Sequence, residues 1–135
     1  VMMLNGALAG LVAITAEPLT PGPITAMFIG SIGAVIMYFG TKMLESYGLD
    51  DVVGAIPVHM FAGIFGTLVV PLTNSDTTFG TQFIGTASVC LFSFGLSWIT
   101  FTILKSTIGL RISKAAEKLG TDKAEVGVTA YSIRD

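Results

Sequence analysis

The chain has 135 residues, of which 52% are hydrophobic and only 12% are charged, and its net charge is −2. A soluble domain usually carries about a quarter charged residues, so a lower fraction gathered around long apolar runs indicates a membrane protein. No basic face is available to neutralise phosphates, which argues against nucleic-acid binding. One histidine and one cysteine form no metal-ligand cluster, so no metal and no cofactor are expected.

Four apolar segments are expected to cross the membrane, at about residues 1–16, 24–47, 52–72 and 83–108. The first carries small residues spaced four apart, at Gly6 and Gly10 and at Ala9 and Ala13. This spacing allows membrane helices to pack closely. The first segment is slightly short for a span and opens on Val1, so we expect the sequence to be a piece of a longer protein.

The third segment is preceded by two carboxylates, Asp50 and Asp51. Acidic side chains are favoured at a helix start, where backbone N–H groups lack partners. We therefore interpret both as helix caps rather than as ligands. Pro57 lies one turn further on, lacks an amide hydrogen, and is expected to kink the segment.

His59 is the only histidine of the chain and lies inside the third segment. Ionisable side chains within a membrane are expensive and are site candidates by default. A lone histidine can equally be structural, holding a neighbouring helix through a hydrogen bond. The small residues around it, such as Ala55, Ala62 and Gly63, fit either a close helix contact or a narrow passage. The residues alone leave both interpretations open.

Residues 109–135 are predicted to form a soluble tail. If the four segments cross alternately, the connection between the second and third lies on the same side as this tail. That side then holds every Lys and Arg of the chain: Lys42, Lys105, Arg111, Lys114, Lys118, Lys123 and Arg134. Cytoplasmic segments are enriched in Lys and Arg. The sequence therefore predicts a multi-pass protein of the cell membrane, with segments 1–108 in the bilayer and a cytoplasmic C-terminus.

Three stretches together resemble the ammonium transporters of the Amt/Mep/Rh family. The run NGALAGLVAITA at 5–16 resembles their eighth helix, and Asp50-Asp51, Val58-His59 and Gly63–Thr67 resemble their tenth. The tail resemblance is carried by Gly109, Leu110, Arg111, Gly120, Asp122 and Tyr131. The resemblance implies an all-α polytopic membrane helix bundle, namely the last four of eleven helices with the cytoplasmic tail.

The resemblance also implies a function, which is ammonium or ammonia transport and not enzyme catalysis. His59 would be the second of two pore histidines, and Ala55 would line the same wall. The full-length protein would be a homotrimer in the lipid bilayer, with regulatory tail residues facing a PII-type signalling protein. The chain departs from the family pattern at Val52, at Met60 and at residues 126–128, where Val-Gly-Val replaces His-Gly-Glu.

Two other functions are compatible with parts of this sequence. The chain could be a small membrane scaffold or a regulatory or sensor subunit, with His59 as a structural contact. An intramembrane enzyme is disfavoured, because the spans hold no Ser/His arrangement and no paired carboxylates.

Overall fold

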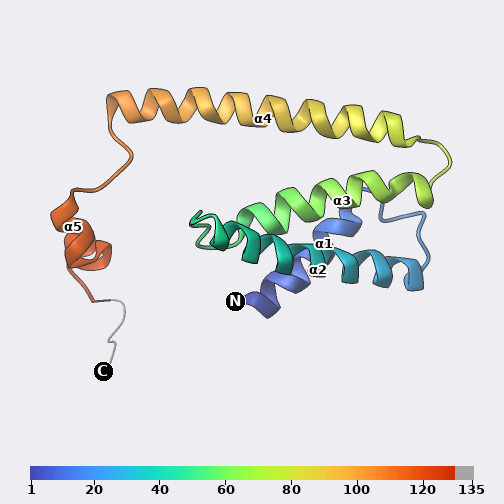
Figure 1. Cartoon of the computed structure of the whole chain (residues 1–135), viewed down its shortest axis with the longest axis horizontal. Helices are drawn as coiled ribbons and strands as arrows, with labels where there is room; N and C mark the ends of the chain where they lie inside the picture. The colour runs from blue at the N-terminus through green and yellow to red at the C-terminus, as the bar shows by residue number, and fades with distance from the viewer. Residues whose placement is uncertain (130–135) are drawn as a thin grey trace. The chain divides into compact units, whose positions relative to one another are not determined.

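The computed structural model describes residues 1–129, which form helices and loops and include no strand (Figure 1). The all-α prediction is therefore confirmed for this part of the chain. The elements are α1 (Met2–Thr15), α2 (Pro23–Ser46), the π-helix η1 (Ile56–Phe61), α3 (Ala62–Val69), the 3₁₀-helix η2 (Val70–Leu72), α4 (Phe79–Thr107), α5 (Lys114–Leu119) and the π-helix η3 (Asp122–Val126). The chain divides into two compact units, Val1–Leu91 and a second that begins at Phe92.

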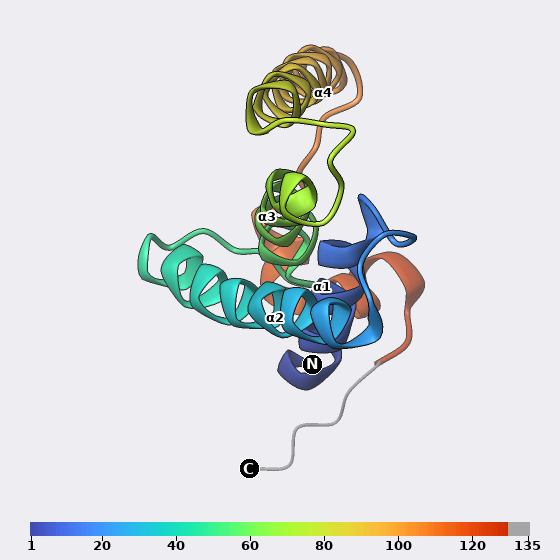
Figure 2. The same ribbon diagram turned by 90° about the vertical axis from the view of Figure 1, so that its right-hand side faces the viewer.

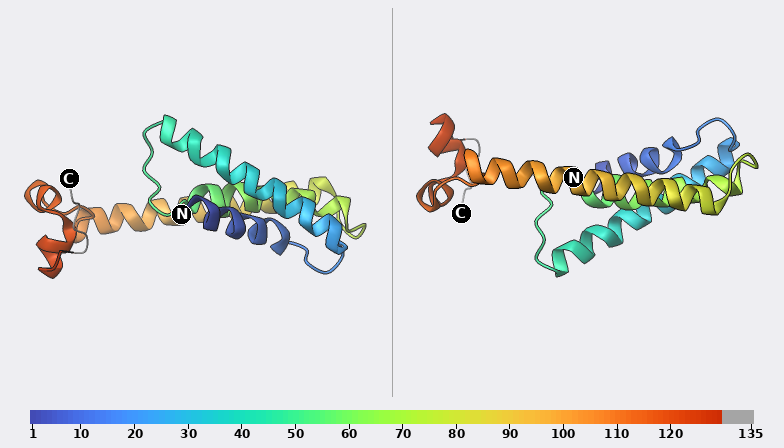
Figure 3. Two further views of the ribbon diagram at one scale, coloured as in Figure 1. Left: turned by 90° about the horizontal axis from the view of Figure 1, so that it is seen from below. Right: turned by 90° about the horizontal axis from the view of Figure 1, so that it is seen from above.

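In the first unit, α1, α2 and the η1–α3 stretch lie side by side and alternate in direction (Figures 1 and 3). The loops 16–22 and 73–78 lie at one end of this bundle, which faces the viewer in Figure 2. The connection 47–55 lies at the other end. A buried cluster of Ala9, Met37, Val58 and Ala62 joins the three helical stretches.

Glycines let the backbones of α1 and α2 touch. A Cβ atom added to Gly10 would lie 3.1 Å from the carbonyl oxygen of Gly30, and one added to Gly33 would lie 2.6 Å from the Cβ of Ala13. α1 and α3 are equally close, because a Cβ on Gly66 of α3 would collide with the backbone of Ala13. The small side chains thus set the spacing of the bundle, as expected for packing between membrane helices.

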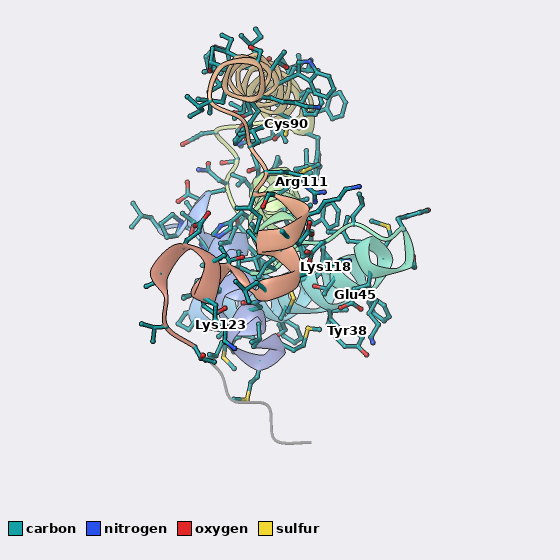
Figure 4. All side chains as sticks on the ribbon, turned by 90° about the vertical axis from the view of Figure 1, so that its left-hand side faces the viewer. Tyr38, Glu45, Cys90, Arg111, Lys118 and Lys123 are labelled. Carbon is teal, nitrogen blue, oxygen red and sulfur yellow. The ribbon has the colours of Figure 1, made fainter. Side chains whose placement is uncertain are left out.

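Two helices of the described chain are long and apolar enough to cross a membrane, namely α2 and α4. Two shorter apolar helical stretches, Met2–Thr15 and Ile56–Leu72, accompany them. In α4 no residue is buried, and its side chains point outward on every side and are mostly carbon (Figure 4). A helix that is apolar all round requires lipid or further protein around it.

The second unit starts within α4, and a glycine lies two residues beyond the last residue of this helix, Thr107. Gly109 has a φ of +81° and donates its N–H to the carbonyl of Leu104 at 3.0 Å, as is common where a helix stops. Ser113 then caps the short α5, accepting the N–H of Ala116 at 3.2 Å.

Candidate functional site

The helix that carries His59 is held at its start by Asp51. One carboxylate oxygen accepts the N–H of Ala55 at 2.8 Å, and the other accepts the N–H of Ile56 at 2.7 Å. These are backbone donors without helical partners, which an acidic side chain satisfies well. Asp50, by contrast, is exposed and makes no interaction within residues 1–129. Of the two carboxylates, only Asp51 reaches the helix backbone.

Pro57 coincides with a widened helix rather than a simple bend. The six residues Ile56–Phe61 form a π-helix, and regular α-helix begins at Ala62. The expected helix start near residue 52 is occupied by a turn, in which Gly54 donates its N–H to Asp51 at 3.1 Å. Because proline has no N–H and its ring crowds the preceding turn, a wider turn accommodates it. Such π-bulges are frequent at functional sites.

One face of this helix is covered and the other is open. Pro57 and Val58 are buried against the bundle. Ala55, Ile56, His59 and Met60 are exposed, and the His59 ring has no bonding partner within residues 1–129. The structure therefore places Ala55 and His59 together on an open face, beside Met60, whose exposed fraction is 49%.

Asn5 of α1 reaches the turn that precedes this helix. Its side-chain amide nitrogen donates to the carbonyl oxygen of Val53 at 3.0 Å, across 48 residues of sequence. A Cβ on Gly54 would lie 2.5 Å from the same nitrogen, and Gly54 has a φ of +74°. A glycine is thus required here both by backbone conformation and by the closeness of Asn5.

A second cross-link joins the two loops at the opposite end of the bundle. Glu17 accepts the side-chain N–H of Asn74 at 2.9 Å, and also the backbone N–H of Leu19 at 3.0 Å and of Thr20 at 3.3 Å. The hydrogen bond from Asn74, followed by that from Leu19, lowers the pKa of Glu17 from its usual 4.5. The loops 16–22 and 73–78 are therefore tied at the same end.

The tail residues singled out from sequence fall into two groups. Leu110 and Arg111 line a hollow of about 320 Å³ in the second unit, together with Ile112, Glu117, Thr121 and Glu125. Arg111, Lys118 and Lys123, which are labelled in Figure 4, all belong to the tail.

Gly109 and Gly120 have positive φ angles, and Asp122 opens η3 beside Gly120. Tyr131 lies outside the described residues.

Sequence reasoning passed over the side-chain bonds of Asn5, Glu17 and Asn74. No local pattern signals these bonds, because they join segments 48 and 57 residues apart in the sequence. Within the described residues, no group of three or more His, Cys, Asp or Glu side chains could hold a metal ion. The open face of η1 thus offers hydrogen bonding by a single imidazole among apolar groups.

Comparison with known proteins gives a consistent result over nearly the whole chain. The sequence profile of the Ammonium Transporter Family matches residues 1–131. Ammonium transporter Amt2 of Archaeoglobus fulgidus is 39% identical over 96% of the chain, and Ammonium transporter Amt2 of Methanocaldococcus jannaschii is 35% identical over 94%. The ammonium transporter of Corynebacterium glutamicum is 32% identical over 96%. The chain spans about a third of the length of these relatives, 32% in each case.

Proposed function

The chain belongs to the ammonium transporter family, and from that premise we propose that it forms part of a membrane path for ammonium or ammonia. The observation that carries the proposal is the open face of η1, where Ala55 and His59 are exposed while Pro57 and Val58 between them are buried. A membrane helix with one covered face and an imidazole on the other fits the wall of a conduit.

The chain is proposed to supply the C-terminal part of the transporter, because it spans about a third of its relatives. In this proposal, residues 1–108 contribute four of eleven membrane helices, and residues 109–135 form the cytoplasmic tail. The two shorter apolar stretches, Met2–Thr15 and Ile56–Leu72, then cross the membrane beside α2 and α4. The rest of the protein would cover the open face and complete the conduit.

The chemistry follows from what can pass an apolar wall. Moving the charged ammonium ion into the membrane core costs free energy, and neutral ammonia avoids this cost. We propose that ammonium gives up its proton at or before the narrow part, that ammonia passes along the imidazoles, and that the proton moves separately along the same imidazole pair and rejoins ammonia at the far side. A neutral imidazole donates from one nitrogen and accepts at the other, so His59 can bond ammonia and hand on a proton. A second histidine elsewhere in the protein would be its partner.

The hydrogen bond between Glu17 and Asn74 supports alternate crossing of the segments, because it ties the first and third loops at one end of the bundle. The connection 47–55, next to Lys42, lies at the other end. The nitrogen of Lys42 lies 5.6 Å from the centre of the Tyr38 ring, and tyrosine is enriched at membrane–water interfaces. The tail and Lys42 are accordingly proposed to face the cytoplasm.

The assembly and its partners are proposals on the same family basis. The full-length protein would be a homotrimer in the cell membrane. The tail segment with Gly109, Leu110, Arg111, Gly120, Asp122 and Tyr131 would be regulatory, with a PII-type signalling protein as its partner. The replacement of His-Gly-Glu by Val-Gly-Val at 126–128 changes what such a partner would meet.

The test is His59→Ala in the full-length protein, reconstituted in vesicles, with uptake of methylammonium and the accompanying proton current as readouts. We expect the proton-coupled component to fall about tenfold or more, since loss of a proton-transferring side chain typically costs at least that. Val35→Ala, at an exposed position of α2, serves as the matched control and should transport normally. Unchanged flux and current in an intact His59→Ala trimer would make His59 a structural contact instead.

A further inference from the structure

The carbonyl of Val53 lies in the turn before the helix, and no backbone N–H of the described residues bonds it. In an α-helix each carbonyl accepts the N–H four residues later, which for Val53 is residue 57. Residue 57 is proline and has no N–H. In a membrane protein such a freed carbonyl must find another donor, commonly from a neighbouring helix.

Asn5 provides that donor. Its side-chain nitrogen lies 3.0 Å from the Val53 oxygen, and the bare Cα of Gly54 lets it approach, since a Cβ there would lie only 2.5 Å away. The turn of residues 51–54, which we name the capping turn, is thus held from two sides. Asn5 binds its carbonyl at Val53, while the Asp51 carboxylate binds the first free amides of the helix.

We propose that Asn5 is a positioning residue for His59, replacing the backbone donor that Pro57 lacks and so fixing the direction in which the His59 helix leaves the capping turn. This inference rests on the proposed transport function. His59 lies two residues beyond Pro57, and the buried Pro57 and Val58 side chains pass the constraint on to it. Asn5 itself is half-buried in α1 and is not on the open face of η1.

The first test compares Asn5→Ala and Asn5→Asp in the full-length protein. Asp has the size of Asn, and its ionised carboxylate can only accept hydrogen bonds, so in assays above neutral pH both variants lose the donor while only one loses volume. We expect both to lower the maximal transport rate about tenfold with little change in the half-saturating concentration, because a displaced but intact group mainly slows the transfer step. Wild-type rates in Asn5→Asp would overturn the proposal.

The second test restores the missing amide. Pro57→Ala gives residue 57 an N–H, which bonds the Val53 carbonyl once Gly54 leaves its φ of +74° and the helix extends back to the turn. We expect the double variant Asn5→Ala/Pro57→Ala to transport at least severalfold faster than Asn5→Ala alone. If Asn5→Ala lowers the transport rate by the same factor in wild type and in Pro57→Ala, Asn5 acts by another route and the proposal is overturned.

Thermal unfolding of wild type, Asn5→Ala, Pro57→Ala and the double variant separates this proposal from the transport function. If either the Asn5 side chain or an N–H at residue 57 can serve as the donor to Val53, Asn5→Ala lowers the melting temperature more when Pro57 is intact than in the Pro57→Ala background. This expectation does not depend on what the protein transports. If wild type fails to transport while this coupling is present, the proposed function fails and the hydrogen bond stands. In the converse outcome, wild type transports and His59→Ala is impaired, while Asn5→Ala and Pro57→Ala show no coupling in transport rate or in melting temperature. The proposed function then stands and only the role of Asn5 fails.

Discussion

Asp51 and Asp50 are adjacent carboxylates in different situations. Asp51 accepts two backbone N–H groups at 2.7–2.8 Å, whereas Asp50 is exposed and unbonded in the described chain. We propose that Asp51 alone caps the helix that carries His59. Its acceptor atoms satisfy donors that would otherwise have no partner near the membrane.

Asp51→Ala is expected to destabilise the full-length protein by about 1–2 kcal/mol, the usual cost of losing a helix cap. Asp50→Ala is the matched control, since it removes the same charge one residue away, and it should change stability by less than about 0.5 kcal/mol. Thermal unfolding in detergent compares the two. Equal losses would indicate that net charge, and not the cap, determines the effect.

Single residues differ in how well their roles can be predicted from sequence. An acidic pair before an apolar run is a local signal, and a lone histidine in that run is conspicuous because its polar ring is costly there. Asn5 and Val53 are 48 residues apart, and Glu17 and Asn74 are 57 apart. Bonds between distant side chains leave no periodic trace, so they became visible only when the helices were placed.

Contacts between α1 and α2 depend on glycine at the crossing point. A Cβ on Gly33 would lie 2.6 Å from the Cβ of Ala13 and 2.9 Å from the carbonyl oxygen of Ala9. Neither atom belongs to a flexible side chain, so the two helices would have to move apart.

Gly33→Ala is therefore expected to destabilise the protein by about 1–3 kcal/mol, the usual range for overpacking. Gly85→Ala in α4 makes the same chemical change where no atom lies within 4 Å in the described chain, and it should be neutral or slightly stabilising. Melting temperatures of the two variants give the comparison. A similar loss at both positions would mean that the cost is not one of packing.

The link between the loops 16–22 and 73–78 depends on a charged Glu17. Because its hydrogen bonds lower the pKa of Glu17 below 4.5, the carboxylate is favoured in the folded state. The link therefore stabilises the protein fully above pH 4.5, and this contribution is lost as the pH falls through the lowered pKa. Asp76, whose N–H donates to Asn74 at 2.9 Å, is the other carboxylate of these loops.

We compare the melting temperatures of wild type and Glu17→Gln. As the pH drops from about 5 to about 3, we expect the melting temperature of wild type to decrease more than that of Glu17→Gln. Glutamine can still accept hydrogen bonds but does not titrate, and Asp76 is present in both proteins. Parallel pH profiles would show that the loop link carries no pH-dependent stability.

The apolar elements were more predictable than the turns between them. Long apolar runs located α2 and α4, since a helix of about 20 mostly apolar residues has the length that crosses a bilayer. The π-helix η1 and its late start were not foreseen, because the pattern of apolar residues is the same for a kinked and a widened helix. Pro57 identified the place of the distortion and not its form.

At the scale of residues 1–129, exposed apolar surface indicates where lipid or further protein would pack. α4 buries no residue, and the His59 face of η1 is open. A chain that spans about a third of its relatives would be expected to leave such surfaces. The family could be recognised from motif order alone, whereas the second histidine that we propose as the partner of His59 could not be placed, since His59 is the only histidine among the 135 residues.

Membrane orientation is the remaining property that the charge distribution predicts. The loops with Glu17 and Asp76 share one end of the bundle, and every Lys and Arg falls on the other side if the segments alternate. Trypsin should therefore cleave the exposed Lys114, Lys118 and Lys123 in inside-out vesicles and spare them in right-side-out vesicles.

Single cysteines test the same orientation from outside the cell. They are introduced into full-length protein whose other cysteines have been replaced. Ser75→Cys lies in the loop 73–78, and Ala115→Cys lies in α5; both positions are exposed. A membrane-impermeant maleimide added to intact cells should label Ser75→Cys and not Ala115→Cys, because moving the five basic residues from Lys105 to Lys123 across the bilayer is strongly disfavoured. Labelling of Ala115→Cys alone would invert the topology and place the tail outside the cell, away from any cytoplasmic signalling protein.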